Sequence, residues 1–315
     1  MTSSQRRALL ISICLSIVGY GAWIVLTETD AIVASIKRLS PAVIIGVFAL
    51  SLLNYALRFV RYHGYMKYLG DHVPIRKNIL YYLAGFALTT TPGKAGESIR
   101  ALYLHKHKVP VEHSFAVLFV ERIQDLVAVL FLAMLALISL PQFHWILWTG
   151  LGLITTLLII IQVRSFPHYL ERLGQARGGW LLKVSQFTSM LFKRSQKLLE
   201  FRPLLAGLII GLLAWSAEAY GFILLIKDLG YDSPALFLAG IYAAAMLVGA
   251  ISFLPGGLGS AEATMTLLLL GIGITHADSV SATLICRIAT LWFAVFIGVA
   301  VMTYLESKQN VPSAE

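Results

Sequence analysis

Residues 89–104 read TTTPGKAGESIRALYL, and they interrupt a chain that is otherwise strongly apolar. A proline, two glycines, a glutamate and an arginine stand here between the apolar run of residues 78–88 and a longer run that begins at Phe115. Residues 252–266, SFLPGGLGSAEATMT, repeat the pattern near the end of the chain. Proline and glycine break regular helices, so the fold depends on what these two interruptions do inside an apolar protein.

The composition is typical of a polytopic helical membrane protein. The chain has 315 residues, of which 58% are hydrophobic and 13% charged, whereas soluble domains carry about 25% charged residues. Apolar runs of about 20 residues match the hydrocarbon thickness of a bilayer, whereas a transmembrane barrel would show alternating segments of about ten. The runs predict an all-α fold with full spans at residues 8–26, 41–60, 115–139, 145–163, 203–226 and 279–305.

The formal net charge of +9 follows the positive-inside rule and does not indicate nucleic-acid binding. Residues 164–202 carry eight Lys and Arg, whereas 141–145 carry none and 227–233 carry one. This asymmetry predicts that 164–202 are cytoplasmic, together with both termini and residues 61–78, in the cell (inner or plasma) membrane. Lys37 and Arg38 violate the rule, because the same count places them outside.

The linker of residues 164–202 contains an amphipathic stretch at 169–200. We expect a helix there that lies on the anionic inner leaflet, with its Lys and Arg near the headgroups. A solvated connector is the alternative. Cys14 and Cys286 each lie in an apolar run, so the sequence supports neither a disulfide framework nor a metal cluster.

The first interruption predicts a re-entrant hairpin. Residues 79–91 are too short to span, and residues 98–108 end in charges that belong on the cytoplasmic side. The tip, residues 91–97, would therefore lie at membrane depth. Irregular backbone survives at that depth only where it is buried in protein or lines a wet cavity.

The second interruption reproduces the first at a nearly constant distance along the chain. Glu97 precedes Arg122 by the same 25 positions that separate Glu262 from Arg287. The motif LLNYALR (52–58) likewise resembles LLAWSAE (212–218), which aligns Arg58 with Glu218. We therefore predict two repeats of opposite orientation, each with a re-entrant or broken hairpin, giving about six full spans plus two hairpins.

The prediction of two repeats divides one transmembrane domain, 1–315, into consecutive parts. The alternative for the second hairpin is that residues 234–254 span the membrane fully, since they are long enough. The parts are residues 1–40 with an extra helix, 41–163 as the first repeat, 164–202 as the linker, 203–305 as the second repeat and 306–315 as a tail.

Ionisable residues in or beside the apolar segments mark the candidate site, because each costs about 2.5–3.5 kcal/mol to insert. The N–H groups that open a helix after each tip attract anions, and an Arg fork suits phosphate. Alternatively, the two Glu–Arg pairs only lock each hairpin to the next helix. The candidate substrate-binding residues are Pro92, Gly93, Lys94, Gly96, Glu97, Arg100, Glu121, Arg122, Asp125, Glu218, Pro255, Gly256, Gly257, Gly259, Glu262 and Arg287.

Other constellations are weaker. His105, His107 and His113 with Glu112 are compatible with a metal, but solvated interfacial residues are the simpler interpretation, and we expect no metal and no cofactor. Ser260 is interpreted as a helix N-cap, since no nucleophile motif surrounds it. Neither tip ends in the G-K-[ST] of a nucleotide-binding loop.

The motifs TPGKAGESIR, FVERIQD, FLPGGLGSAE and CRIATLWF resemble the lysylphosphatidylglycerol synthase transmembrane family, flippase-like proteins of bacteria and archaea. The resemblance covers nearly the whole chain and implies about eight membrane-inserted units. It also implies that Glu97, Arg122, Glu262 and Arg287 occupy motif positions. In two-part members the membrane domain moves aminoacylated phosphatidylglycerol between leaflets and precedes a soluble aminoacyl-transferase domain. This chain stops at Glu315, so we expect that it does not make that lipid.

The sequence therefore predicts a lipid translocase that is not an enzyme and that moves a lipid with an anionic or phosphate headgroup, of the phospholipid, aminoacyl-phospholipid or polyprenyl-phosphate type. Its predicted partners are membrane lipids. Two alternatives stay open: a non-catalytic partner of a lipid synthase or glycosyltransferase, and an intramembrane lipid-modifying enzyme. The second would need a nucleophilic or metal-binding cluster at membrane depth.

Overall fold

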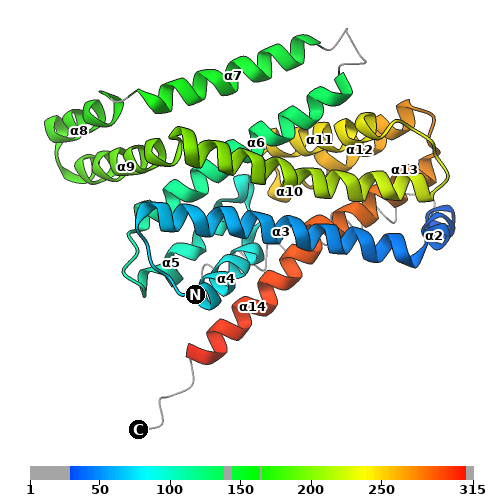
Figure 1. Cartoon of the computed structure of the whole chain (residues 1–315), viewed down its shortest axis with the longest axis horizontal. Coiled ribbons are helices and arrows are strands. Elements are labelled where there is room, and N and C mark those ends of the chain that lie inside the picture. The colour runs from blue at the N-terminus through cyan, green and yellow to red at the C-terminus, as the bar shows by residue number, and fades with distance from the viewer. Residues whose placement is uncertain (1–28, 138–143, 164, 310–315) are drawn as a thin grey trace.

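The computed structural model describes residues 29–137, 144–163 and 165–309, and every regular element in these ranges is a helix (Figure 1). The predicted span at 8–26 lies outside the described residues. The prediction of an all-helical membrane protein is confirmed. Within the described ranges, three helical segments are long and apolar enough to cross a bilayer: Pro41–Leu69 (α3), Phe201–Asp228 (α10) and His276–Lys308.

Two further helices lie where the sequence predicts spans. They are α6 (Val111–Leu137) and α7 (His144–Gln162). The last long segment is α13 (His276–Arg287) followed by one π-helical stretch, Ile288–Trp292, and by α14 (Phe293–Gln309). The number of full spans stays a prediction.

Each interruption forms a hairpin of two helices joined by irregular backbone. The first consists of α4 (Ile75–Gly85), η1 (Phe86–Leu88), η2 (Pro92–Ile99) and α5 (Arg100–His105). The second consists of α11 (Ala235–Ile251), η4 (Pro255–Gly257) and α12 (Ser260–Gly271). A proline opens the 3₁₀ turn at each tip, as expected from its fixed φ.

The turns that lead into the two hairpins have the same conformation. Gly70 and Gly230 follow α3 and α10 with φ of 94° and 96°. Each donates its N–H to the carbonyl three residues earlier at 3.0 Å. Pro74 and Pro234 then stand directly before α4 and α11. The order of elements therefore recurs: long helix, left-handed glycine turn, broken hairpin, long helix.

The long helices that begin the two halves, α3 and α10, pack side by side and antiparallel (Figure 1). The N–H of Ser40, at the start of α3, donates to Asp228 at the end of α10 over 2.6 Å. At the other end the Tyr65 hydroxyl donates to the carbonyl of Pro203 over 3.1 Å. The two long helices thus run in opposite directions along the bundle.

As a consequence, the two hairpins enter the bundle from opposite ends. The base of the first lies at the end where Asp71 pairs with His113 and Tyr68 bonds Glu200. The base of the second lies at the end where Tyr231 approaches Thr275. The tips meet, since η2 packs on η4. A Cβ added to Gly256 would lie 3.5 Å from the Cα of Thr90.

Each hairpin packs on the long helical segment that follows the hairpin of the other half. Helix α14 packs on α4 and η1, whereas α11 packs on α6. One apolar core therefore joins Tyr82 and Phe86 of the first hairpin with Met302 of α14. The other joins Tyr242 and neighbouring residues of the second hairpin with Val129 of α6. The two halves share their cores and do not form separate bodies.

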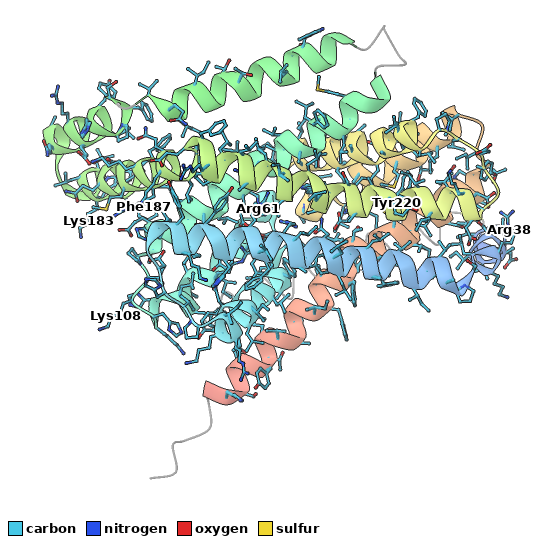
Figure 2. All side chains as sticks on the ribbon, in the orientation of Figure 1. Arg38, Arg61, Lys108, Lys183, Phe187 and Tyr220 are labelled. Carbon is cyan, nitrogen blue, oxygen red and sulfur yellow. The ribbon has the colours of Figure 1, made fainter. Side chains whose placement is uncertain are left out.

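The short helix α2 (Thr29–Arg38) docks on α13 at the end that the charge count places outside. The Ser35 hydroxyl donates to Asp278 over 2.6 Å, and Arg38 (Figure 2) forms an ion pair with the same carboxylate. Arg38 is therefore neutralised where it lies, which gives a physical reason for its exception to the positive-inside rule.

The linker differs from the single helix expected over 169–200. It forms α8 (Ser165–Arg177) and α9 (Gly179–Leu198), because Gly178 and Gly179 adopt positive φ and reverse the chain. Ser189 and Lys193 donate to Glu171 over 2.6 and 2.8 Å, and the bond from Lys193 is the main reason that the pKa of this carboxyl falls to about 2.

The linker is also not a solvated connector, because α9 packs on α6. The ring of Phe187, labelled in Figure 2, lies 5.8 Å from the ring of Phe115, and Phe192 lies 6.3 Å from Phe119. Contact of this helix with a lipid leaflet stays a prediction.

Candidate functional site

Beside the first tip, ion pairs join seven side chains from α3, η2, α5 and α6, which we call the arginine cluster. Six of them are almost completely buried, and the seventh, Arg122, keeps 21% of its side chain exposed. The cluster brings together residues far apart in the sequence. Its members are Arg58, Arg61, Glu97, Arg100, Glu121, Arg122 and Asp125.

Asp125 of α6 is the centre of one half of this cluster. Its carboxylate contacts the guanidinium groups of Arg61 at 2.6 Å, Arg122 at 3.2 Å and Arg58 at 3.3 Å. Both arginines of α3 lie one turn apart and therefore face the same side of that helix. The close approach of three cations to one anion is possible only because further carboxylates lie beside them.

Glu97 and Glu121 provide that compensation. Arg100 donates to Glu97 over 2.6 Å and to Glu121 over 3.4 Å. The Thr89 hydroxyl donates to the other oxygen of Glu97 over 3.0 Å. Arg122 approaches Glu97 at 3.7 Å, so the ion pair suggested by their spacing is present. Glu97 thus connects the tip to α6.

Arg100 is the most tightly enclosed member. Its guanidinium lies 4.4 Å from the ring centre of Tyr82 and 5.2 Å from that of Tyr62. Gly85 leaves the room for it, since a Cβ there would come within 2.6 Å of the Arg100 Nε. Two carboxylates and two aromatic faces therefore fix this arginine in place.

Arg61 and Arg58 are site residues that are missing from the candidates predicted from sequence. The apolar runs place Arg61 in the cytoplasmic link after a span ending at 60, but α3 continues to Leu69 and buries its side chain completely. Figure 2 labels it among the packed helices. The available signal is its distance of three positions from Arg58, which places both on one helix face.

A second group of ionisable side chains, which we call the glutamate cluster, lies beside the second tip and consists of Glu218, Glu262 and Arg287. Arg287 donates to Glu262 over 2.6 Å and to the carbonyl of Gly256 over 2.7 Å. The N–H of Gly259 donates to Glu262 over 2.7 Å. Tyr242 donates to Glu218 over 2.5 Å. Arg287 therefore holds both the tip and the helix after it.

The second tip also corrects one prediction. Gly259, with φ of 82°, precedes α12 and has the position of the N-cap, whereas Ser260 is the first helical residue. The Ser260 hydroxyl donates to the carbonyl of Gly257 over 3.0 Å. Gly257, with φ of 68°, lies so close to Gly249 that a Cβ would come within 2.9 Å of its Cα.

The remaining candidates of the first tip lie in η2. The Gly96 N–H donates to the Thr91 hydroxyl over 2.6 Å, and a Cβ at Gly96 would clash with Leu88. Pro92, Gly93 and Lys94 belong to the same 3₁₀ segment, but the side chains of Pro92 and Lys94 lie outside the described part of the structure.

The other sequence candidates do not join these clusters. His113 contacts Asp71 at 2.9 Å, and His107 lies 3.2 Å from the Tyr81 hydroxyl. Within the described ranges no group of three or more His, Cys, Asp or Glu is arranged to hold a metal.

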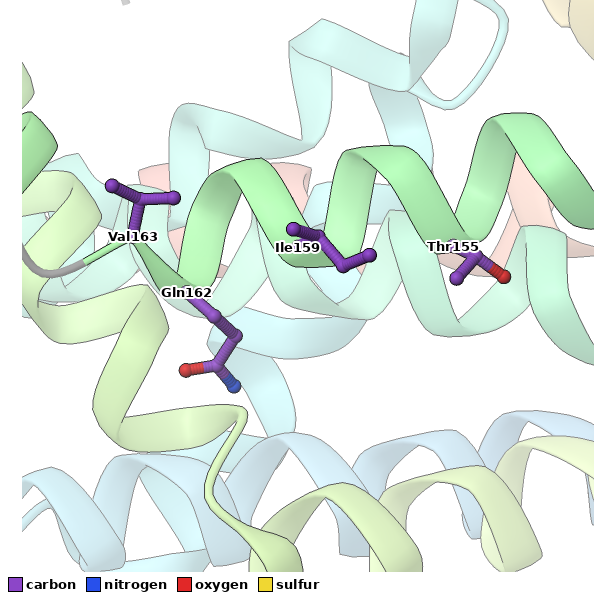
Figure 3. Close-up of a pocket in the computed structure, with 4 residues that line it drawn as sticks. All are labelled: Thr155, Ile159, Gln162 and Val163. Carbon is purple, nitrogen blue, oxygen red and sulfur yellow. The ribbon is translucent and has the colours of Figure 1, made fainter.

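A pocket of about 400 Å³ lies elsewhere, on α7 (Figure 3). The Gln162 amide in its lining donates to the carbonyl of Leu199 over 3.0 Å. The lining carries no ionisable group, so this pocket offers no chemistry comparable to that of the two clusters. It is lined by Thr155, Ile159, Gln162 and Val163.

Arg287→Ala is expected to lower the free energy of unfolding by about 3 kcal/mol, because Glu262 would remain buried without its cation. Adding Glu262→Gln should recover at least half of that loss. Thermal unfolding of the purified single and double variants in detergent measures both effects. A double variant as unstable as Arg287→Ala alone would show that the pair does not carry this stability.

The fold and the buried clusters define the class: a polytopic helical membrane protein with ionisable groups held inside the bundle. The chain belongs to the family described as lysylphosphatidylglycerol synthase TM region, which matches residues 8–298.

Its relatives include a UPF0104 membrane protein of Methanothermobacter thermautotrophicus, 25% identical over 95% of this chain and 96% of the relative. UPF0104 membrane protein PH1989 of Pyrococcus horikoshii is 25% identical over 80% and 83%. UPF0104 membrane protein MJ1595 of Methanocaldococcus jannaschii is 22% identical over 89% of each chain. The resemblance inferred from the motifs is thereby confirmed at the level of the family.

Proposed function

We propose that this protein is a lipid translocase that moves a lipid with an anionic or phosphate headgroup between leaflets. The observation that carries the proposal is the meeting of η2 and η4 inside the bundle, each beside a cluster of buried charges. Family membership adds support, since the family is described as the membrane region of a lipid synthase.

The energetic argument concerns the charges. Ionisable groups at membrane depth cost about 2.5–3.5 kcal/mol each to insert. A cluster as large as the arginine cluster therefore has a high free-energy cost, which a merely structural role does not explain. Apolar residues of similar volume commonly replace buried ion pairs without loss of stability. Locking of the hairpins by Glu97 and Glu262 is compatible with transport, because the same pairs can open when a headgroup replaces one partner.

The architecture supplies the second argument. Irregular backbone at depth is tolerated where it lines a binding cavity, and transporters with inverted repeats place their site between such segments near the midplane. The antiparallel halves and the opposed hairpins described above fit that arrangement. We therefore propose that the two halves are inverted-topology repeats with both termini in the cytoplasm.

Orientation can be tested with single cysteines introduced at Lys77 and Asp232, both exposed, in a variant lacking Cys14 and Cys286. An impermeant maleimide should label the first only from the cytoplasmic side and the second only from the opposite side. Labelling is measured on sealed vesicles of each orientation. Labelling of both positions from one side would exclude opposed hairpin bases.

Transport itself can be tested in vesicles with a fluorescent phosphatidylglycerol, measuring how fast the outer leaflet exchanges with the inner one. We expect exchange with the wild type, and a loss of about tenfold or more in Glu97→Ala/Glu262→Ala, since both tips lose their carboxylates. Glu200→Ala/Asp232→Ala is the matched control, because it removes two exposed carboxylates. Equal exchange by all three proteins would show that the tips are not the site.

The linker is proposed to contact the anionic inner leaflet. Along α9 the exposed side chains of Trp180 and Val184 share one helix face, with Lys183 and Arg194 beside them. Apolar residues flanked by basic ones are the pattern of interfacial helices. This contact would hold α9, and with it the start of α6 around Phe115, near the membrane surface.

A further inference from the structure

Arg122 and Arg287 follow their hairpin glutamates by the same number of residues, but the structure holds them differently. Arg287 is 4% exposed and donates to Glu262 and to the Gly256 carbonyl at 2.6 and 2.7 Å. Arg122 keeps 21% of its side chain exposed, and its ion-pair distances are 3.2 and 3.7 Å. One arginine is fixed, whereas the other is loosely held at the edge of its cluster.

The arginine cluster contains donors that the described protein atoms do not satisfy. Its ion pairs join four arginines to three carboxylates, an excess of one positive charge. A buried donor without an acceptor is costly, and more so when it is charged. Arg122 Nη2 and Arg61 Nε have carboxylates within ion-pair distance, at 3.2 and 3.9 Å, but form no hydrogen bond among the described residues. The other buried nitrogens of the cluster without a hydrogen-bond partner among the described residues are Arg58 Nε, Arg61 Nη1, Arg100 Nε and Arg122 Nε.

The first tip is also more polar than the second tip. The first carries the hydroxyls of Thr89, Thr90 and Thr91, and the first two of these residues are buried. The positions after Ser252 in the second tip are instead Phe253 and Leu254, which are 73% and 46% exposed. The buried hydroxyl-bearing residues, the excess positive charge and the unsatisfied donors therefore all lie near the first tip.

We propose that the arginine cluster is a binding site for a phosphodiester monoanion, and that Arg122 is the residue that contacts the phosphate first. A phosphodiester carries one negative charge, which matches the excess of the cluster, and its oxygens accept the fork of an arginine. Arg287 is then the structural counterpart that fixes the second tip. This inference rests on the proposed function and assigns the headgroup chemistry to one half of the molecule.

Binding can be measured with purified protein in a neutral detergent, using dihexanoyl-phosphatidylglycerol and soluble glycerophosphoglycerol as separate probes. We expect the lipid to bind, with an affinity about tenfold lower for Arg122→Gln and an intermediate loss for Arg122→Lys, which keeps the charge without the fork. Arg202→Gln, an exposed arginine at the start of α10, should bind as the wild type does. Circular dichroism confirms that each variant is folded.

The two probes separate the sources of the phosphodiester. Binding of both with the same dependence on Arg122 assigns recognition to the phosphodiester itself, and binding of the lipid alone with that dependence assigns it to a lipid headgroup. Equal affinity of Arg122→Gln and the wild type, or binding of neither probe, overturns the site.

The exchange assay then distinguishes the two proposals. Arg122-dependent binding without exchange between leaflets would refute the translocase and keep the site. Exchange of the lipid between leaflets, together with binding that is unchanged in Arg122→Gln, would refute the site and keep the translocase.

Discussion

Asp125→Asn is expected to lower the free energy of unfolding by about 5 kcal/mol, the upper end of the range for breaking a buried ion pair. The carboxylate of Asp125 contacts three guanidinium groups within 3.3 Å, and its side chain is 7% exposed. An amide is neutral and donates through its nitrogen, so the substitution leaves Arg58, Arg61 and Arg122 facing one another in a medium that screens charge poorly.

The effect can be measured by equilibrium unfolding in mixed micelles with increasing dodecyl sulfate, or by the yield of folded protein if the variant does not accumulate. Asp232→Asn is the control, because Asp232 is exposed, and such a change usually stays within about 0.5 kcal/mol. Asp125→Asn as stable as this control would mean that the three arginines are compensated by groups other than Asp125.

Gly298→Val should be the second severe change, with an expected loss of about 3–4 kcal/mol, somewhat above the usual cost of overpacking. Gly298 of α14 lies against the first hairpin, and a Cβ at this position would come within 2.1 Å of the Ala87 nitrogen and 2.5 Å of the Phe86 carbonyl carbon. Both atoms are backbone, so no side-chain rotation can relieve the clash. The hairpin or the helix must move.

Gly64→Ala provides the matched control, since Gly64 is also a helical glycine but a Cβ added there would meet no atom within 4 Å. Alanine at this position should raise stability by up to about 1 kcal/mol through helix propensity. Both variants are compared by thermal unfolding in the same detergent. A Gly298→Val melting point equal to that of the wild type would exclude close packing of α14 on η1.

Much of the fold could be predicted because its signals are local. Apolar runs located α3, α7 and α10, and the paired proline and glycine residues located both tips. The spacing of 25 positions also suggested Glu97 with Arg122 and Glu262 with Arg287, and both ion pairs are present at 3.7 and 2.6 Å. Such pairs follow from sequence because each hairpin is joined directly to the helix that carries its arginine.

The structural features that the sequence did not predict depend on backbone conformation or on contacts between segments that are distant in the sequence. Arg61 looked like a basic residue of a cytoplasmic link, and only the carboxylates of Glu121 and Asp125 from α6 make its burial possible. The division of the linker depends on positive φ at Gly178 and Gly179, which composition alone does not reveal. The role of the candidate residues in transport stays a prediction.

Each hairpin packs on a helix of the other half, and this arrangement has a consequence for membrane insertion. The first hairpin rests on α14 through α4 and η1, and α14 is synthesised long after this hairpin, while α11 rests on α6. Until α14 is present, the 3₁₀ backbone around Ala87 would face lipid, and irregular backbone exposed to lipid is not tolerated in the bilayer. The nascent chain must therefore keep this part of the first hairpin near water or the insertion machinery until α14 has been synthesised, and a ribosome stalled before Gly298 should leave a protease-sensitive intermediate.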